Sequence, residues 1–183
     1  MCEGNQAEHR ALPPASRPGR VLGVGAEARL VELGLVLPSA PDLPAHVRIP
    51  FEWAHVVGDR VLLSGHGAVD AAGEVCAPYG RVPSEVSLEE AQASARLVGL
   101  GLLGSLRRAV GDLDRVQAWV VVNGFVNADP GYQRTTAVLN PISDLLLDVF
   151  GDRGRHARTA IGVSALPMNL PVVVSAEVLI APA

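Results

Sequence analysis

The chain has 183 residues, of which 49% are apolar, and its 15 basic and 19 acidic residues give a formal net charge of −4. Because the basic residues form no cluster and aromatic residues make up only 4% of the chain, the composition argues against a nucleic-acid-binding protein. Charged residues interrupt every apolar stretch before it reaches the roughly 18 residues that a membrane span needs, so a membrane protein is not expected either.

The N-terminal segment is rich in Pro and Gly and has few branched or aromatic residues. We therefore predict a disordered tail over residues 1–20 and a single domain over residues 21–183. The two cysteines, Cys2 and Cys76, lie far apart in segments typical of a tail and a loop, which favours a reduced, cytoplasmic protein. The mean hydropathy of +0.28 is high, and we expect the surplus apolar surface to contact a second subunit.

The pattern over residues 26–33 predicts a short helix. Four prolines then force an extended connection: Pro38, Pro41, Pro44 and Pro50. Two apolar runs follow at residues 55–57 and 60–63, and Gly58-Asp59 separates them. This spacing is typical of a β-hairpin with positive φ at its tip. A further strand is expected at residues 67–69.

A long helix is predicted from Leu88 to about Val110, because Ser87 and Glu90 form a capping box at its start. Its apolar residues fall on one face: Ala91, Ala95, Val98, Leu102 and Leu106. Three glycines lie inside it: Gly99, Gly101 and Gly104. Each glycine weakens a helix by roughly 1 kcal/mol relative to alanine, so we expect close packing to compensate. Glycines in mid-helix do not form a phosphate-binding loop.

One more helix and three more strands are predicted after the long helix. A branched run over residues 116–122 predicts a buried strand that continues toward Phe125-Val126. A second helix is expected from Asn140 to Phe150, with Asn140 as its cap and Pro141 in its first turn. Strands at residues 158–164 and 172–180 complete an α+β fold, in which two long helices back one sheet.

The most informative stretch is residues 155–167, which read Arg-His-Ala-Arg-Thr-Ala-Ile-Gly-Val-Ser-Ala-Leu-Pro. Its alternation predicts a half-buried strand, and Arg158 stands where the edge of the sheet meets solvent. A guanidinium there can bind an anion through two parallel hydrogen bonds. An ordinary surface salt bridge is the simpler explanation for a single arginine, and the residue type alone does not separate the two.

Nine segments carry a resemblance to a known family: Val61–Gly65, Ser87–Ala91, Gly111–Val116, Gly124–Asn127, Asn140–Leu146, Val149–Gly151, Ala157–Thr159, Leu166-Pro167 and Pro171–Ala176. In order and spacing they resemble the Rid superfamily of reactive intermediate deaminases, also called the YjgF or L-PSP endoribonuclease-like family. The Gly-Arg-His-Ala-Arg sequence before the strand is similar to a longer, poorly characterised branch. The resemblance implies a chorismate-mutase-like fold with a mixed sheet, a homotrimer with sites between subunits, and no cofactor.

The resemblance also implies an activity, the hydrolysis of an amino-acid-derived imine or enamine to a 2-oxo acid and ammonia. Arg158 falls on the arginine that binds the substrate carboxylate in catalytically competent relatives. The relatives' last strand carries a glutamate that helps to position water, but Val173 occupies that place here and Ser175 the next alternate one. Valine cannot accept a proton, so this departure puts the usual chemistry in question.

Three residues are candidates to replace the missing acid: Glu177, Glu52 and His66. His66 stands where relatives often have glutamine. Each candidate also has an ordinary structural explanation, as a solvated strand residue, a loop carboxylate and a hydrogen-bonded structural histidine, respectively.

The predicted substrate-binding set comprises Phe51, Trp53, Ser64, Gly65, Asn140, Arg158, Ala160 and Val173. Phe51 aligns with a tyrosine of the relatives, and Trp53 is an equal candidate for the apolar wall. Asn140 is explained first as a helix cap and second as a ligand contact. No metal is expected, because His55, His66 and His156 have no recognised metal-binding spacing. Ser64 lacks the flanking glycines of a hydrolase nucleophile elbow.

These observations favour a deaminase-like enzyme that acts on a small carboxylate-bearing metabolite. The alternative is a non-catalytic binding protein for 2-oxo acids, which Val173 favours. Ribonuclease activity, a name attached to some relatives, is disfavoured by the acidic charge balance.

Overall fold

The computed structural model describes residues 24–41 and 48–182, so the tail predicted at residues 1–20 lies outside the described residues. The helices and strands are α1 (Ala26–Glu32), β1 (Ala54–Val57), β2 (Arg60–His66), α2 (Leu88–Val110), β3 (Val116–Asn127), α3 (Thr135–Phe150), β4 (Ala157–Val163) and β5 (Val172–Ile180). Short 3-10 turns lie at Leu113–Arg115, Gly151–Gly154 and Pro167–Asn169.

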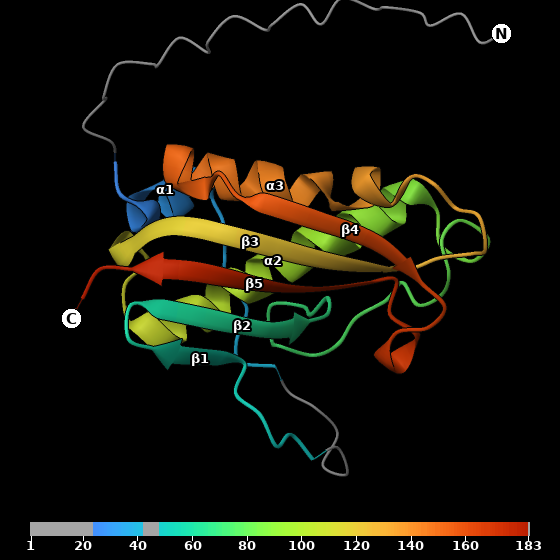
Figure 1. Cartoon of the computed structure of the whole chain (residues 1–183), viewed down its shortest axis with the longest axis horizontal. Coiled ribbons are helices and arrows are strands. Elements are labelled where there is room, and N and C mark those ends of the chain that lie inside the picture. The colour runs from blue at the N-terminus through green and yellow to red at the C-terminus, as the bar shows by residue number, and fades with distance from the viewer. Residues whose placement is uncertain (1–23, 42–47, 183) are drawn as a thin grey trace, which may run out of the picture.

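The five strands form one mixed sheet in the order β1-β2-β5-β3-β4. Only β3 and β4 run parallel, because α3 connects them as a crossover helix, and the other neighbours are antiparallel. Figure 1 shows α2 crossing behind the strands and α3 lying along β4. The expected α+β fold with two long helices behind a mixed sheet is confirmed, and β4 is an edge strand as expected for Arg158.

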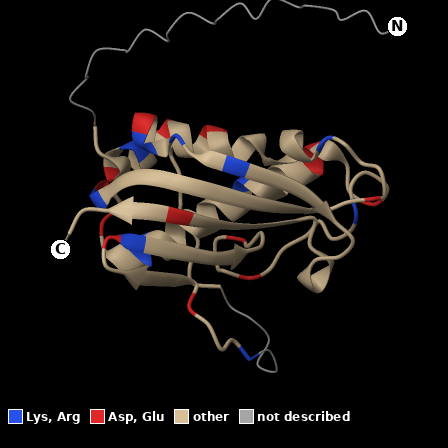
Figure 2. Ribbon diagram, viewed as in Figure 1, with Lys and Arg blue, Asp and Glu red and all other residues tan. Residues whose placement is uncertain are grey.

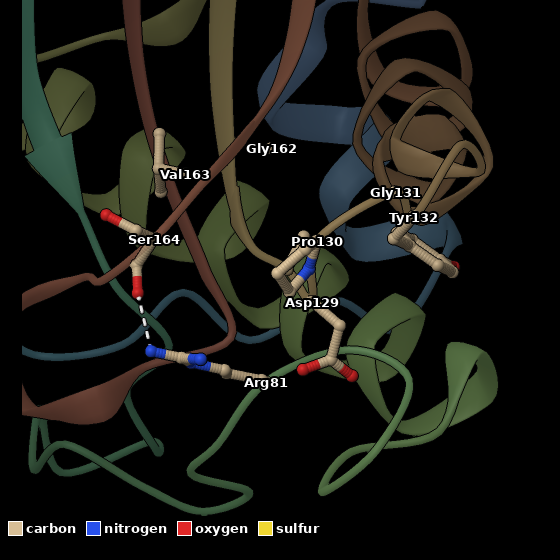
Figure 3. Close-up of a pocket in the computed structure, with 9 residues that line it drawn as sticks. Arg81, Asp129, Pro130, Gly131, Tyr132, Gly162, Val163 and Ser164 are labelled. Carbon is tan, nitrogen blue, oxygen red and sulfur yellow. Dashed lines mark hydrogen bonds between the residues drawn. The ribbon is translucent and has the colours of Figure 1, made fainter.

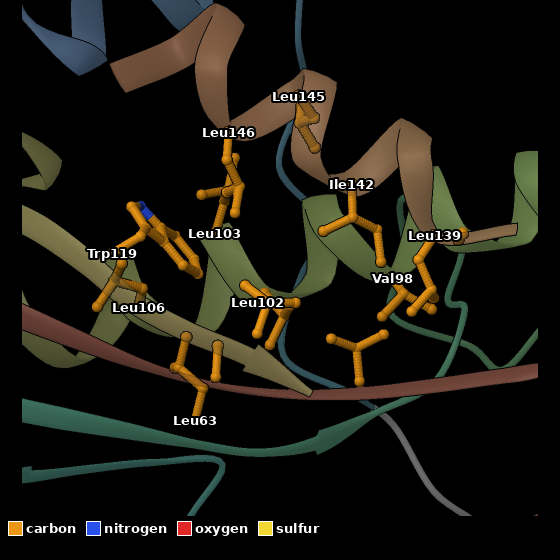
Figure 4. Packing of buried hydrophobic residues seen from close by; sticks show 14 of the residues in the cluster. Leu63, Val98, Leu102, Leu103, Leu106, Trp119, Leu139, Ile142, Leu145 and Leu146 are labelled. Atoms are coloured by element: carbon orange, nitrogen blue, oxygen red, sulfur yellow. The ribbon is translucent and has the colours of Figure 1, made fainter. Parts of the chain in front are cut away.

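The core lies between the helices and one face of the sheet (Figure 4). The residues of β5 alternate strictly between buried and half-buried, because successive side chains of a strand point to opposite faces of the sheet. The packing role predicted for the glycines of α2 is confirmed at Gly99, where an added Cβ would lie 2.8 Å from Leu145 Cδ2 of α3. Gly124 has the same function in β3, since Leu139 packs directly against its backbone.

The predicted hairpin is confirmed. Strands β1 and β2 pair with Val57 opposite Arg60, and Gly58 in the tight turn has a φ of +62°. The prediction of a strand at residues 67–69 is wrong, because only a single bridge between Val69 and Val75 forms there.

The second long helix starts at Thr135, so the expected start at Asn140 is wrong by five residues. Pro141 lies inside the helix, where it cannot donate the usual hydrogen bond to the carbonyl of Ala137. Gln92 of α2 donates to that carbonyl from Nε2 at 2.9 Å and takes over the missing bond. A tertiary contact therefore lets the helix run through its proline.

Replacing Gln92 with alanine should lower the free energy of unfolding by about 1 kcal/mol, because the Ala137 carbonyl would lose its only substitute donor. In a domain of this size the melting temperature should fall by about 2–4 °C. Calorimetry or thermal circular dichroism can measure this shift. Gln133→Ala is the control, since Gln133 is an exposed loop residue, and equal melting temperatures for the two variants would contradict the assigned role.

The other face of the sheet is not covered by any helix of the described residues (Figure 1). It carries apolar side chains that are about half exposed, including Val57, Leu62 and Ile161. We call this surface the open face. Within the described part of the chain, each helix is too short or too polar to cross a membrane.

Candidate functional site

Arg158 is the second residue of β4 and its side chain lies against α3. Its Nη1 donates to Ser143 Oγ at 3.0 Å, and its Nη2 donates to Asn140 Oδ1 at 3.0 Å and to the Thr136 carbonyl at 3.3 Å. These three acceptors lie along one side of α3 and none carries a charge. The guanidinium is thus held in place without being neutralised.

The charge of Arg158 is unusual for this sheet. In the described part of the chain, the strands carry only three residues of the Lys, Arg, Asp or Glu types, namely Arg60, Arg158 and Glu177 (Figure 2). Glu177 pairs with Arg60, whose Nε donates to Oε1 at 2.6 Å. Among residues 24–41 and 48–182, no carboxylate lies within 4.0 Å of the Arg158 guanidinium. Three of its five N–H groups are used, so two remain for a ligand.

Asn140 and Ala160 lie beside Arg158. Asn140 does not cap the helix, because it lies within α3, but its side-chain oxygen accepts directly from Arg158. Ala160 follows two residues later on the same face of β4, and its carbonyl accepts from Thr135 Oγ1 at 3.1 Å. These three predicted site residues form one group, which we call the arginine cluster.

The other predicted binding residues gather around the end of β2. Trp53 lies between Phe51 and His66, with ring centroids 5.3 Å and 5.1 Å apart in edge-to-face arrangements. Ser64 donates from its hydroxyl to the Glu52 carbonyl at 2.7 Å. A Cβ on Gly65 would lie 3.0 Å from Val173 Cγ1, so these two residues are in contact. We call this second group the aromatic cluster.

One chain does not bring the two clusters together. At the usual strand spacing, the β2 residues of the aromatic cluster lie about 14 Å from β4, and Val173 on β5 lies about 10 Å from it. Their side chains also differ in direction. Arg158 is in register with the buried Val122 on the helix side, whereas Val173 is in register with Phe125 and Ile161 on the open face.

His66 is the most buried of the three candidate bases, with 2% of its surface exposed. Its Nδ1 lies 2.7 Å from the Ser64 carbonyl and its Nε2 lies 2.8 Å from Ser105 Oγ. A carbonyl can only accept, so Nδ1 carries the proton and Nε2 accepts from the Ser105 hydroxyl. Both ring nitrogens are occupied, which leaves His66 a structural residue within the single chain.

Burial is the main cause that lowers the pKa of His66 from its ordinary value of 6.5, and the charge of Arg108 adds to it while the Ser64 carbonyl opposes it. The unfolded chain therefore takes up this proton more readily than the folded protein. The free energy of unfolding should be constant above about pH 6.5 and should fall below it, by at most about 1.4 kcal/mol per pH unit.

Urea unfolding at pH 7.5, 6.5 and 5.5 measures this loss. The variant His66→Gln should show a flatter pH dependence of the free energy of unfolding than the wild type. The same slope in both proteins would contradict the assignment of the titration to His66.

The two candidate carboxylates lie away from Arg158. Glu177 is on the open face of β5, where it is paired with Arg60. Glu52 is an exposed residue that precedes β1 and contacts the aromatic cluster only through its backbone carbonyl. Neither carboxylate joins the arginine cluster within one chain.

A separate pocket of about 340 Å³ lies at the far end of β4 (Figure 3). It is lined by residues 128–132 and 162–164 and by Arg81, whose Nη2 donates to the Ser164 carbonyl at 3.1 Å. It contains none of the predicted site residues. The turn that shapes it, Asp129-Pro130-Gly131-Tyr132, closes with a hydrogen bond from Tyr132 N to Asp129 O, and Gly131 has a φ of +82°. The Pro-Gly pair is the sequence feature that predicts such a turn.

Fold and site together define a class: an α+β protein whose edge strand presents a guanidinium held by uncharged acceptors of the crossover helix. The chain belongs to the Rid/YjgF family, because the family model described as "YjgF/chorismate_mutase-like, putative endoribonuclease" matches residues 27–178. The resemblance seen in the sequence is thereby confirmed.

Individual relatives agree with this assignment. Protein TCP17 of Trypanosoma cruzi is 37% identical over 152 residues, which cover 82% of this chain and 91% of that protein. The protein Atu1372 of Agrobacterium tumefaciens, described as of unknown function, is 32% identical with a TM-score of 0.74, covering 85% of this chain and 91% of that chain. A putative endoribonuclease from Shewanella oneidensis is 27% identical with a TM-score of 0.77, covering 86% and 100% of the two chains.

Proposed function

We propose that this protein binds a small carboxylate-bearing metabolite at Arg158 and hydrolyses its imine or enamine form. The observation that carries the proposal is the guanidinium of Arg158, which three uncharged acceptors of α3 hold in place and no described carboxylate neutralises. Charge-assisted hydrogen bonds from a fixed guanidinium suit a planar carboxylate. Membership of the Rid/YjgF family supports the same ligand class.

The proposed reaction needs little from the protein beyond orientation. An enamine first takes up a proton at carbon to give the iminium ion. Water then adds to the iminium carbon, the carbon–nitrogen bond breaks, and the products are a 2-oxo acid and ammonium. Arg158 holds the carboxylate, and Asn140 lies beside it to accept or donate a further hydrogen bond. Because no carboxyl group of the described residues lies in the arginine cluster, a backbone carbonyl or an uncharged side chain such as that of Asn140 would have to hold the water.

We also propose that three chains assemble through their open faces into a homotrimer. Two observations support this: half-exposed apolar side chains lie on that face, and the arginine and aromatic clusters can meet only across two chains. Light scattering should give about three times the 19.1 kDa of one chain. Leu62→Glu should reduce this mass, and a monomeric wild-type protein would contradict the assembly.

The activity can be tested by competition. An amino acid oxidase generates imines in the presence of semicarbazide, which traps them as semicarbazones. The protein should slow semicarbazone formation and release 2-oxo acid, and Arg158→Lys should do so much less. Unchanged semicarbazone formation with wild-type protein across several amino acid substrates would contradict the deaminase proposal.

A second candidate is a non-catalytic binding protein for 2-oxo acids. The observations that favour it are the apolar Val173 at the place of the relatives' glutamate and the pairing of Glu177 with Arg60. This candidate predicts that pyruvate binds with micromolar affinity and that imines are not consumed. The same competition assay, combined with a pyruvate titration, separates the two functions.

Ribonuclease activity has less support. The family description and the solved relative from Shewanella oneidensis carry the name endoribonuclease, but the net charge is −4 and the described strands carry only two cationic residues. Any RNA binding whose affinity does not change with salt concentration would exclude phosphate recognition. We further propose a cytoplasmic location, because Cys76 forms no disulfide within the described part of the chain.

A further inference from the structure

Two histidines of this protein are bound in the same way. In each, Nδ1 lies 2.7 Å from the carbonyl two residues earlier, and Nε2 contacts a serine hydroxyl that accepts from an arginine at 3.0 Å. The first set is His66, Ser105 and Arg108, of which His66 and Ser105 are buried in the core. The second set is His156, Ser143 and Arg158, with 3.0 Å between Nε2 and Oγ. The second set therefore ends on the arginine of the candidate site.

The direction of each hydrogen bond in the second set follows from its ends. The Gly154 carbonyl can only accept, so His156 Nδ1 carries the proton of the neutral ring. Nε2 is then an acceptor, and the Ser143 hydroxyl donates to it. Arg158 can only donate, and it does so to the remaining lone pair of Ser143. The neutral ring thus turns the Ser143 oxygen into an acceptor aimed at Arg158.

We propose that His156 and Ser143 are positioning residues that orient the Arg158 guanidinium for the carboxylate of its ligand. The proposal rests on the ligand class given under the proposed function, and it adds the groups that hold Arg158 ready. His156 acts through Ser143 and does not itself touch the ligand.

Four variants test the hydrogen bonds that join His156, Ser143 and Arg158 one at a time. Ser143→Ala removes the middle hydroxyl, and Ser143→Thr keeps it. His156→Asn keeps an amide donor for the Gly154 carbonyl but loses the acceptor at the Nε2 position, whereas His156→Gln places an oxygen acceptor there. Ser105→Ala is the matched control, because it removes the same hydroxyl from the core set.

Nitrogen-15 NMR of the ligand-free protein tests the arrangement directly. At pH 7.5 the His156 ring should carry its proton on Nδ1, and hindered rotation should give separate Nη signals for Arg158. Ser143→Ala and His156→Asn should merge these signals, while Ser143→Thr, His156→Gln and Ser105→Ala should keep them. A proton on Nε2, or unchanged Arg158 signals in Ser143→Ala, would overturn the proposal.

A titration with pyruvate tests the consequence. Ser143→Ala and His156→Asn should weaken pyruvate binding by about 2- to 10-fold at pH 8, the range expected for one lost hydrogen bond. Normal binding by Ser143→Ala with lost binding by Arg158→Lys would overturn the positioning role alone. No pyruvate binding by wild-type protein, with the NMR result as expected, would count against the proposed function alone.

Discussion

Replacing Arg158 with lysine should weaken the binding of a small carboxylate ligand by about 10- to 150-fold. The guanidinium spans Ser143, Asn140 and Thr136, and two of its N–H groups have no partner among residues 24–41 and 48–182. The three donors of a lysine ammonium diverge from a single atom, so they cannot satisfy the acceptors of α3 and a ligand together. Isothermal titration with pyruvate measures the loss.

Arg60→Lys is a matched control for this experiment, because it makes the same chemical change in another strand. Arg60 pairs with Glu177 on the open face and is not part of the arginine cluster. Its variant should bind pyruvate within about twofold of wild type, since exposed ion pairs contribute little. Urea unfolding of both variants checks that the half-buried Arg158 is not needed for folding itself. Equal pyruvate affinity in Arg158→Lys and wild type would rule out the carboxylate site.

Features encoded by neighbouring residues could be predicted from the sequence. The capping box of Ser87 and Glu90 places the start of α2 correctly, and the hairpin follows from two apolar runs around Gly58. Each pattern lies within one short stretch of the sequence, so it can be interpreted without knowledge of the tertiary structure.

The start of α3 could not be predicted in this way. Its first residues carry no side-chain cap, whereas Asn140 and Pro141 have the local form of a helix start. What allows the helix to begin earlier is the bond from Gln92 to the carbonyl that Pro141 leaves free. Gln92 lies 45 residues away, and only the packing of α2 on α3 brings it there.

The candidate site likewise has features that the sequence predicts and features that only the tertiary structure shows. The sequence identifies Arg158 and the edge strand that carries it, but it does not show the face on which the side chain lies. That depends on the register between β3 and β4, which aligns Arg158 with the buried Val122. Ser143 and His156 escaped the site prediction for the same reason, since a serine inside a helix gives no local sign of a contact 15 residues away.

His66 shows why isolated titratable residues are weak evidence. Its place in the sequence made it a candidate base, yet its surroundings are those of the core, with both nitrogens bonded and the pKa lowered mainly by burial. None of the three candidate bases, His66, Glu52 and Glu177, therefore lies in the arginine cluster of the described chain. Introducing a carboxylate at the place of the relatives' glutamate tests whether its absence limits the reaction.

Replacing Val173 with glutamate should raise the rate of imine hydrolysis by about 100-fold, the lower range for a well-placed general base. Val173 is half-buried, contacts Gly65 of the aromatic cluster and faces the side on which we propose that a second chain packs. A carboxylate there can take a proton from the attacking water. The semicarbazide competition assay measures the gain.

Two control variants show whether a gain in the rate of hydrolysis comes from a base at position 173. In Val173→Gln the new side chain has nearly the shape of glutamate but cannot act as a base, so this variant should stay at the wild-type rate. Ser175→Glu places the same charge one alternate position along β5, farther from Gly65. Adding Arg158→Lys to Val173→Glu should abolish the gain, because the substrate carboxylate would lose its anchor. If Val173→Glu hydrolyses imines no faster than Val173→Gln, the missing carboxylate is not what limits turnover. Pyruvate binding without turnover would then identify a protein that kept the anchor and lost the reaction.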